Sequence, residues 1–462
     1  MWIPTFRLLT QLSVEAVFLI VGAVGGVLYV FGTPPFQVPD EPHHFFRAFQ
    51  VAQGGILAEK RGDTTGGVVP TALVRIADRF TEGVIYHPER KLSPHLLTST
   101  LLTPWNKADT TFANFPNTAL YSPVPYIPSV LVTAIGYQTG VPPLIVFYAC
   151  RLANLVVGLL LIAFAIRFVP VYKWVLFVTC LTPMFMYQLA SVSADAMTNS
   201  LGVLLTALFL RYSLVTEQRV TTGGLAMFFT VALLFALCKT GYFTLALLFF
   251  LIPSGKFPTW RWWMASGLGL VLLSWVVSLT WAGLIQGLFS PYLKMGVSPE
   301  DAIRFIQLNP LRFSGMVLDN LFRYGLFYTG SYIGYLGWLD VKLPEVFVTI
   351  YALVILGVCL TSGHCRMHFD LSRKGLLAGV FLLSVLLIIT SQYLIWTPVN
   401  SRIIDAAQGR YFIPIAPTLF LLIFNRKYPA DKFDALHRNV LPTFVFLSLL
   451  FSLGFVIHRY YL

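Results

Sequence analysis

The chain is poor in charge for its length. Only 11% of its 462 residues are Asp, Glu, Lys or Arg, and 56% are hydrophobic, whereas a soluble domain carries about 25% charged residues. Because the deficit extends along the whole chain, it excludes a soluble globular protein and indicates a polytopic membrane protein. The 32 basic residues outnumber the 20 acidic ones, but they stand in short clusters between apolar runs. Such clusters are typical of loops that set membrane topology, so no nucleic-acid partner is expected.

Paired cysteines, internal repeats and low-complexity tracts are also missing. Without paired spacing, the five cysteines give no sign of a zinc site or a disulfide framework. We expect them to be small buried hydrophobic residues. The lack of a repeat weakens the case for an inverted-repeat transporter. The cysteines are Cys150, Cys180, Cys238, Cys359 and Cys365.

Long apolar runs are present instead, and a membrane span needs about 20 such residues. The first run, 12–31, is too long for a signal-peptide core and lacks a small-x-small cleavage site, so it is interpreted as an uncleaved span. The predicted fold is an all-α bundle of about 11 transmembrane helices in a single integral membrane domain, 1–462. The predicted spans are 12–31, 143–168, 172–190, 195–214, 223–238, 240–253, 262–286, 343–360, 375–397, 410–424 and 440–457.

One segment, 121–136, decides the topology. Three prolines crowd its first half, which favours an amphipathic helix in the membrane interface over a span. The loops on one side then hold 14 Lys and Arg, and the short turns on the other side hold three. The positive-inside rule therefore places the N-terminus in the cytoplasm and the C-terminus outside. Two long outer segments follow, 32–142 with interfacial helices and 287–342, in which Ser298 is a predicted helix N-cap.

Ionisable residues gather at the outer face under this topology. Ionisable groups at membrane depth are costly, so those that persist are candidates for function. A carboxylate there can deprotonate an acceptor hydroxyl, and Lys or Arg can bind a phosphate leaving group. The main candidates are Asp40, Glu41, His43, His44, Arg47, Asp195, Lys239, Asp340, Asp405, Gln408 and Arg410.

The segment around Asp40 and Glu41 has several interpretations. A helix that starts near Pro42 puts Asp40 and His44 one turn apart, with Arg47 near the same face. The acids could equally form an exposed helix start, and the histidines could be solvated or packed. A divalent metal is chemically compatible with Asp, Glu and His, but no second ligand pair has a recognisable spacing, so none is predicted.

The other candidates also have simpler interpretations. Lys239 and Arg410 could be cations that reach lipid headgroups, and Asp195 could cap its helix. Arg151 lies inside a predicted span, so we expect it to face the bundle and pair with a polar group.

Six motifs together resemble a bacterial membrane-protein family of unknown function, marked by Pro-Asp-Glu-x-x-His near the N-terminus and Gln-Gly-Arg-Tyr-Phe near the C-terminus. They occur in the family's order and span roughly 35–425. The motifs are Pro39-Asp-Glu-Pro-His-His-Phe45, Tyr121-Ser-Pro-Val-Pro-Tyr126, Arg151-Leu-Ala-Asn154, Ser193-Ala-Asp-Ala196, Gly337-Trp-Leu-Asp340 and Gln408-Gly-Arg-Tyr-Phe412.

That family in turn is similar to the GT-C superfamily of glycosyltransferases, which use polyprenyl-phosphate sugars. Its members include the protein O-mannosyltransferases and the aminoarabinose transferases of lipid A. They place an Asp-Glu pair after the first span, then a proline-rich interfacial helix, then a span with Arg-Leu near its start. Here Asp40-Glu41, 121–136 and Arg151-Leu152 follow that order, but the His-Phe behind the acids is spaced about one residue further than in the mannosyltransferases.

The resemblance implies an inverting sugar transfer at the outer face of a bacterial inner membrane. Asp40 would be the base on the acceptor, because the first acid is usually the base in the related transferases, and Glu41 would assist or orient it. Lys239 and Arg410 would hold the donor phosphate, though no family motif fixes either assignment. The other candidates would support the site or contact the acceptor, a cell-envelope glycan or lipid-linked molecule. Loop 287–342 and region 60–118 would recognise that acceptor.

Two alternatives remain at this point. A flippase for a lipid-linked saccharide would need ionisable groups near the bilayer midplane and some internal repetition. An assembly factor for envelope polysaccharide would not need the acids at all. The concentration of ionisable groups at one face and the large, asymmetric first loop favour an enzyme.

Overall fold

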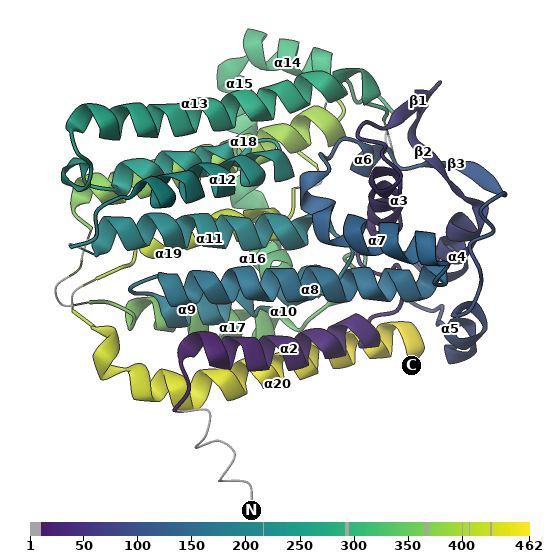
Figure 1. The fold of residues 1–462 in the computed structure, drawn as a ribbon, viewed down its shortest axis with the longest axis horizontal. Helices are drawn as coiled ribbons and strands as arrows, with labels where there is room; N and C mark the ends of the chain where they lie inside the picture. Colours follow the sequence, from purple (N-terminus) through teal and green to yellow (C-terminus); the bar gives the residue numbers. More distant parts are fainter. Residues whose placement is uncertain are drawn as a thin grey trace, which may run out of the picture.

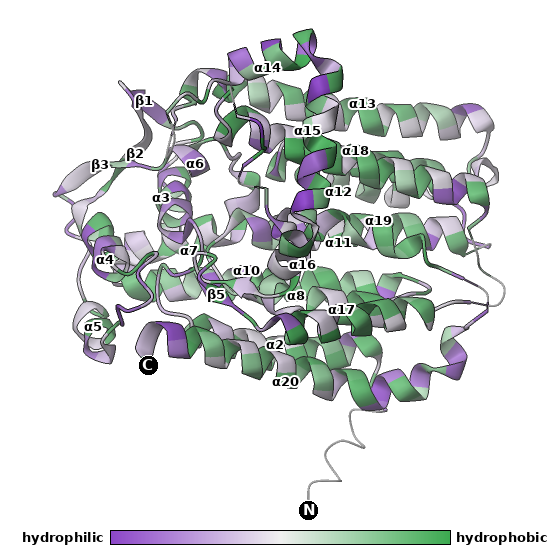
Figure 2. Cartoon of the chain, turned by 180° about the vertical axis from the view of Figure 1, so that it is seen from behind, coloured by the Kyte–Doolittle hydropathy of each residue, from purple (hydrophilic) through white to green (hydrophobic). Residues whose placement is uncertain are grey.

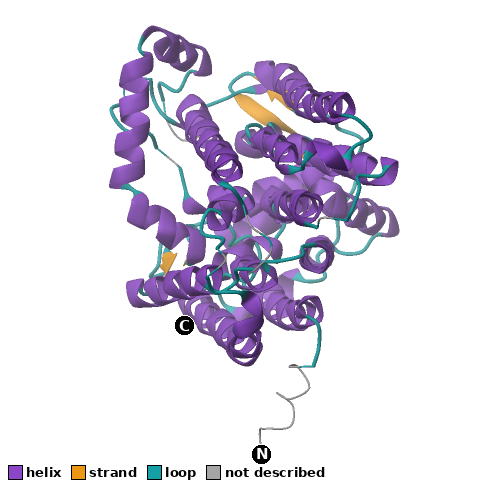
Figure 3. Cartoon of the chain, turned by 90° about the vertical axis from the view of Figure 1, so that its left-hand side faces the viewer, coloured by secondary structure: helices purple, strands orange, loops and turns teal. Residues whose placement is uncertain are grey.

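The computed structural model describes residues 11–462 except 216, 292–294, 365, 366, 368, 400, 406 and 426. It is a mostly helical protein whose long helices lie side by side, with smaller elements covering one end (Figure 1). The long helices are predominantly apolar, and polar segments gather at their ends (Figure 2). In the view along the bundle, many of these helices are seen end-on (Figure 3).

Five helices in the described part of the chain are long and apolar enough to cross a membrane, or six if the bent pair α10–α11 counts as one span. This confirms a helical membrane protein. The helices that meet the criterion are α2 (Val14–Gly32), α8 (Pro143–Phe168), α13 (Trp260–Ile285, continued by η4, Gln286–Leu288), α18 (Leu371–Trp396) and α20 (Asp434–Tyr461); the bent pair is α10 (Pro183–Leu189) and α11 (Ala194–Leu214).

The remaining predicted spans form shorter elements, so the count of eleven stays a prediction. A 3₁₀ helix rises about 2.0 Å per residue, so the ten residues of η2 reach only part of the way across a hydrocarbon layer of about 30 Å. In η5 a proline, Pro414, interrupts the hydrogen-bond ladder. These elements are α9 (Lys173–Cys180), α12 (Thr222–Cys238), η2 (Tyr242–Leu251), α17 (Glu345–Leu360), η5 (Gly409–Ile415) and α19 (Ala416–Leu421). Two short 3₁₀ helices, η3 (Ser254–Lys256) and η6 (Ala430–Lys432), lie in predicted inner loops.

The first predicted outer segment, 32–142, folds over one end of the bundle (Figure 1). Helix α3 crosses that end and packs against α7. Helix α7 is not among the candidate spans, and its interfacial position stays a prediction. A three-stranded antiparallel sheet with the order β1–β2–β3 lies beside α3. The elements are α3 (Glu41–Ala52), β1 (Glu59–Arg61), β2 (Thr64–Pro70), α4 (Thr71–Thr81), α5 (Pro94–Thr100), β3 (Thr110–Asn114), α6 (Pro116–Ala119), η1 (Val124–Tyr126) and α7 (Ile127–Thr139).

The second predicted outer segment contributes three consecutive helices and a small hairpin. Ser298 caps α14 by accepting a hydrogen bond from the Asp301 amide at 3.2 Å, which confirms the predicted N-cap. Large apolar side chains on α15, among them Leu311 and Phe322, are exposed, as suits a helix at a membrane surface. The elements are α14 (Pro299–Leu308), α15 (Pro310–Arg323), α16 (Gly325–Ile333), β4 (Tyr335–Leu336) and β5 (Val341–Lys342).

The cysteines behave as the sequence predicts wherever they are described. Cys150, Cys180, Cys238 and Cys359 are buried free thiols, and Cys365 lies outside the described residues. They contribute small apolar groups to the packing between helices.

Candidate functional site

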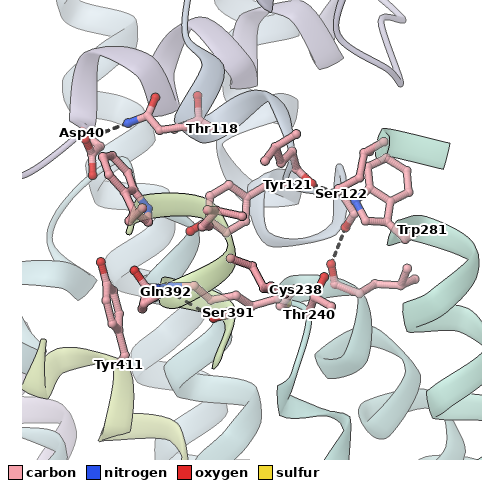
Figure 4. Close-up of a pocket in the computed structure, with 18 of the residues that line it drawn as sticks. Asp40, Thr118, Tyr121, Ser122, Cys238, Thr240, Trp281, Ser391, Gln392 and Tyr411 are labelled. Carbon is pink, nitrogen blue, oxygen red and sulfur yellow. Dashed lines mark hydrogen bonds between the residues drawn. The ribbon is translucent and has the colours of Figure 1, made fainter. Parts of the chain in front are cut away.

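A cavity of about 260 Å³ opens where α3 and α6 meet the ends of α12, α13 and α18 (Figure 4). We call it the Asp40 cavity. Asp40 and Tyr411 lie toward one side of it, and Ser122, Thr240 and Trp281 toward the other. Its polar lining comes from Asp40, His44, Asn117, Thr118, Tyr121, Ser122, Lys239, Thr240, Ser391, Gln392 and Tyr411, and its apolar lining from Leu120, Leu237, Cys238, Trp281, Ile285, Leu394, Ile395 and Trp396.

Asp40 is held in an unusual backbone conformation at the start of α3. It is the N-cap residue, with φ 63° and ψ 6°, yet its side chain makes no capping hydrogen bond. The carboxylate turns instead toward Asn117, whose Nδ2 donates to Oδ1 at 2.7 Å. Oδ2 has no hydrogen-bond donor among the described residues. Residues in sparsely populated backbone conformations cluster at functional sites.

Asn117 links Asp40 to His43. Because the amide Nδ2 donates to Asp40, its Oδ1 accepts, and His43 Nδ1 lies 2.6 Å away as the donor. Burial lowers the pKa of His43, and the negative charge of Asp40 opposes that shift. A neutral His43 therefore fixes the amide, and the amide orients the carboxylate.

His44 lies one helical turn after Asp40, as predicted, and its amide donates to the Asp40 carbonyl at 2.9 Å. Its Nδ1 is 2.6 Å from the Tyr126 hydroxyl. Burial lowers the pKa of His44 to about 4; Asp40 and Asp195 oppose the shift, whereas Lys239 and Arg410 add to it. These four charged groups come from distant parts of the sequence, and all of them lie near enough to act on one imidazole.

The lowered pKa of His44 predicts how stability depends on pH. An unfolded histidine has a pKa of about 6.5, so between pH 6.5 and about 4 the unfolded state binds the extra proton. The free energy of unfolding should therefore rise with pH across this window and fall on acidification. His44→Gln should flatten the slope in pH-dependent unfolding measurements, whereas the exposed control His95→Gln should not. Equal slopes in the two variants would contradict the assignment.

Lys239 occupies the tight break between α12 and η2. Gly241, with φ 100°, lets the chain reverse there. The ammonium lies 3.2 Å from Asp195 Oδ1 and 4.4 Å from the centre of the Tyr411 ring. Gln188 donates to Asp195 Oδ2 at 2.7 Å and is itself held by Asn199 at 2.9 Å. Asp195 and Lys239, which the sequence analysis assigns only to the same face, are thus in direct contact within a polar network.

Arg410 is a buried cation that forms no ion pair with the described residues. Its side chain is 7% exposed and lies beside Tyr411, with Nη2 3.5 Å from the phenol oxygen. Its Nε is buried and has no hydrogen-bond partner. A buried guanidinium without a carboxylate is costly, and an anionic ligand would compensate it.

Gly409 allows Arg410 to reach this position. A Cβ at residue 409 would lie 1.8 Å from the Tyr328 carbonyl oxygen, which is backbone and cannot move aside easily. The Gly409 amide also donates to Ser331 Oγ at 2.7 Å, which fastens η5 to α16. Glycine is therefore needed in the Gln-Gly-Arg-Tyr-Phe motif for close packing.

Gly409→Ala should lower the free energy of unfolding by about 1–3 kcal/mol, because overpacking of this kind displaces backbone. Gly454→Ala is the matched control, since nothing lies within 4 Å of the Cβ that it would add. Thermal unfolding of both variants in detergent checks the prediction, which fails if the two variants melt together.

Glu41 does not line the Asp40 cavity. It is fully buried against Arg151, with Nε–Oε1 at 2.9 Å and Nη2–Oε2 at 2.6 Å, and its Oε1 also accepts from the Val192 amide. Arg151 donates as well to the carbonyls of Val30, Thr33 and Pro34 at the end of α2. The prediction that Arg151 pairs with a polar group is confirmed, and Glu41 suits the orienting role better than a reacting one.

The other predicted site residues either make structural contacts or lie outside the Asp40 cavity. Arg47 donates to Gln50 and to the carbonyls of Gly55, Ile56 and Tyr121, so it fastens the chain after α3. Asp340 pairs with Arg459 at 2.7 Å and accepts from the Trp338 amide. Asp405 and Gln408 line a separate cavity.

Several residues of the site were not among the sequence candidates. Tyr121, Tyr126 and Tyr411 stand in the quoted motifs, and their order was a usable signal. The sequence gives no signal for Asn117, Gln188 and Asn199, because the role of a side-chain amide can be inferred only when its neighbours in space are known. No group of three or more His, Cys, Asp or Glu in the described ranges is arranged to hold a metal ion.

Comparison with known proteins gives a family. No curated protein and no solved structure matches the chain. The family described as "Predicted membrane protein (DUF2142)" matches residues 24–419, a range that includes the Asp40 cavity and the motifs at both ends of the chain. The chain belongs to this family of predicted membrane proteins.

Proposed function

We propose that the protein is an inverting glycosyltransferase with a GT-C-like layout, which transfers a sugar from a polyprenyl-phosphate donor to a glycan or lipid-linked acceptor at the outer face of a bacterial inner membrane. One observation carries the proposal. Asp40, a carboxylate with one oxygen free of donors among the described residues, lines the cavity with Lys239 and Tyr411. Arg410, a buried cation without an ion pair among the described residues, lies directly behind Tyr411.

The charges suit the two ends of a displacement reaction. Asp40 takes the proton of an acceptor hydroxyl, and the oxygen attacks the anomeric carbon of the donor sugar. The bond from that carbon to the phosphate oxygen breaks, and its electron pair stays on the phosphate. Arg410 and Lys239 stabilise the charge that develops there. The products are the glycosylated acceptor, with inverted anomeric configuration, and polyprenyl phosphate.

The apolar lining suits a lipid carrier. Trp281 and Ile285 of α13 and Ile395 of α18 lie in the wall of the cavity. Helix α13 is mostly exposed along its length, with Leu272 54% and Leu279 47% exposed, and such a face in a membrane protein contacts lipid. A prenyl chain could therefore extend from the cavity along α13 and α18 into the bilayer.

The experiment is a transfer assay with purified full-length protein in nanodiscs, given polyprenyl-phosphate sugar labelled in the sugar and a set of envelope glycans. Formation of a new glycosidic bond with inverted configuration is expected. Movement of intact donor across a liposome membrane, with no bond formed, would overturn the proposal in favour of a flippase.

Arg410→Gln should weaken binding of the donor phosphate by about 10- to 100-fold, because a hydrogen bond to a charged group contributes about 1.5–3 kcal/mol. Titration of the nanodisc-held protein with farnesyl phosphate measures the dissociation constant. Arg323→Gln is the control, since this arginine is exposed and pairs with Asp319. Equal affinities for wild type and Arg410→Gln would contradict the phosphate assignment.

A further inference from the structure

Another cavity, of about 220 Å³, lies where α2, α9 and α20 begin. We call it the Glu15 cavity. Helix α2 runs from it across the bundle toward α3, which carries the Asp40 cavity (Figure 1). Because the 19 residues of α2 span about 28 Å, the two cavities are separated by most of a hydrocarbon layer. The lining residues that matter here are Glu15, Tyr172, Lys173, Ser362, Asp434 and Arg438.

Two oxygens of the Glu15 cavity are buried without a partner. Glu15 Oε2 and Ser362 Oγ are shielded from solvent, and neither has a hydrogen-bond partner among the described residues. Ser362 as a whole is only 2% exposed. A buried polar group without a hydrogen bond is costly, and a bound ligand would compensate that cost.

The charged side chains of the Glu15 cavity are balanced in number but only half of them are paired. Arg438 Nε lies 2.5 Å from Asp434 Oδ2, and Trp174 Nε1 donates to Asp434 Oδ1 at 2.9 Å. Glu15 and Lys173 form no ion pair, either with each other or with another described residue. One uncompensated negative charge and one uncompensated positive charge therefore share the cavity.

The positive side of the Glu15 cavity suits a phosphate group. Helix α9 begins here, and its N-cap residue Tyr172 makes no capping hydrogen bond with its side chain. The amide groups at the N-terminus of a helix favour an anion, and Lys173, the first residue of α9, adds a full charge. The Ser362 hydroxyl can donate to a phosphate oxygen as well.

The negative side selects the rest of the ligand. A primary ammonium donates hydrogen bonds and would compensate the Glu15 carboxylate, whereas a choline group has no N–H to donate. Pockets for anionic lipids are clusters of Lys and Arg, and Glu15 would repel a headgroup with a net negative charge. A phosphate joined to a primary amine meets both requirements, which is the chemistry of phosphoethanolamine.

The helices beside the Glu15 cavity provide a surface for acyl chains. Ile20 and Val24 of α2 are exposed, as are Leu436 and Val440 of α20, and the two helices pack against each other. Exposed apolar side chains on membrane-spanning helices contact lipid, so a headgroup in the cavity can remain attached to its chains in the bilayer.

We propose that the Glu15 cavity binds the headgroup of phosphatidylethanolamine, with its ammonium at Glu15 and its phosphate at Lys173, Ser362 and the N-terminus of α9. The predicted topology places this lipid in the cytoplasmic leaflet. The site is independent of the proposed sugar transfer at the opposite end of the bundle.

Native mass spectrometry of the full-length protein in detergent tests the site by titration with phosphatidylethanolamine, phosphatidylglycerol and phosphatidylcholine of identical acyl chains, and with soluble glycerophosphoethanolamine. Phosphatidylethanolamine should bind saturably and about tenfold more tightly than each of the others. Glu15→Gln should remove this preference and leave the affinity for phosphatidylglycerol unchanged. Lys173→Gln should weaken binding of both lipids. Asp431→Asn and Lys432→Gln are the matched controls, because both residues are exposed on η6 and lie outside the lining.

The wild type alone can overturn the headgroup site, even if a variant misfolds. Equal affinities for phosphatidylethanolamine and phosphatidylglycerol would reduce the site to phosphate attraction, and an equal affinity for phosphatidylcholine would remove the role of the ammonium. Equally tight binding of glycerophosphoethanolamine would rule out a lipid as the ligand. A folded Glu15→Gln variant that keeps the wild-type preference would contradict the assignment of Glu15.

Discussion

Asp40→Asn is expected to lower the rate of sugar transfer by about 10²- to 10⁴-fold, the usual contribution of a general base. Asn keeps the size of the side chain, tolerates the left-handed backbone at this position and can still accept from Asn117. It cannot take the acceptor proton. The loss should therefore fall on kcat, with donor binding and thermal stability close to wild type.

The matched control is Asp319→Asn, which removes an exposed carboxylate paired with Arg323 on α15. It should transfer sugar at the wild-type rate. Steady-state assays with labelled donor compare the two variants. Full activity in Asp40→Asn would rule out Asp40 as the base.

Glu41→Gln is expected to lower the free energy of unfolding by about 3–5 kcal/mol. The substitution removes the charge that compensates Arg151, and both side chains are fully buried. Breaking one partner of such a pair leaves a buried charge, which is more costly than removing the pair altogether. Arg151 also donates to three backbone carbonyls at the end of α2. A displaced Arg151 should therefore change the conformation of the segment between α2 and α3, which positions Asp40.

A double-mutant cycle with Glu41→Gln, Arg151→Met and the combined variant separates the ion pair from the carbonyl contacts. Reversible unfolding in mixed micelles gives the free energies. Arg323→Gln should change stability by less than about 1 kcal/mol, because that pair is exposed. If Glu41→Gln stays as stable as wild type but loses transfer as completely as Asp40→Asn, Glu41 is a reacting acid and its orienting role is wrong.

The sequence predicts long helices well and short ones poorly. The predicted span 143–168 coincides with α8, and 12–31 differs from α2 by one or two residues. Apolar periodicity and length were sufficient there because nothing interrupts the runs. The run 240–253 is as apolar, yet it folds as a 3₁₀ helix. Composition does not separate these geometries; tertiary packing against α11, α13 and α18 decides between them.

The candidate site, too, could be predicted only in part from the sequence. The predicted topology assigns Asp40, Asp195, Lys239 and Arg410 to one face, and in the structure the charges of all four act on His44. The sequence could not tell which charges would be compensated. Glu41 and Asp340 looked as available as Asp40, but Arg151 and Arg459 neutralise them from far along the chain. Pairing is a property of the folded chain, so a cation such as Arg410, which has no ion pair among the described residues, becomes visible only in three dimensions.

The backbone at Asp40 has a consequence for how this position can change. An aspartate that capped α3 would stabilise it by about 1 kcal/mol, and this one makes no capping hydrogen bond. It also holds a left-handed conformation that most residues avoid. Asparagine tolerates this conformation equally and could also accept from Asn117, so stability gives no reason to prefer an acid over asparagine at position 40. Variants selected only for thermal tolerance should therefore drift away from aspartate here, while variants selected for activity should retain it.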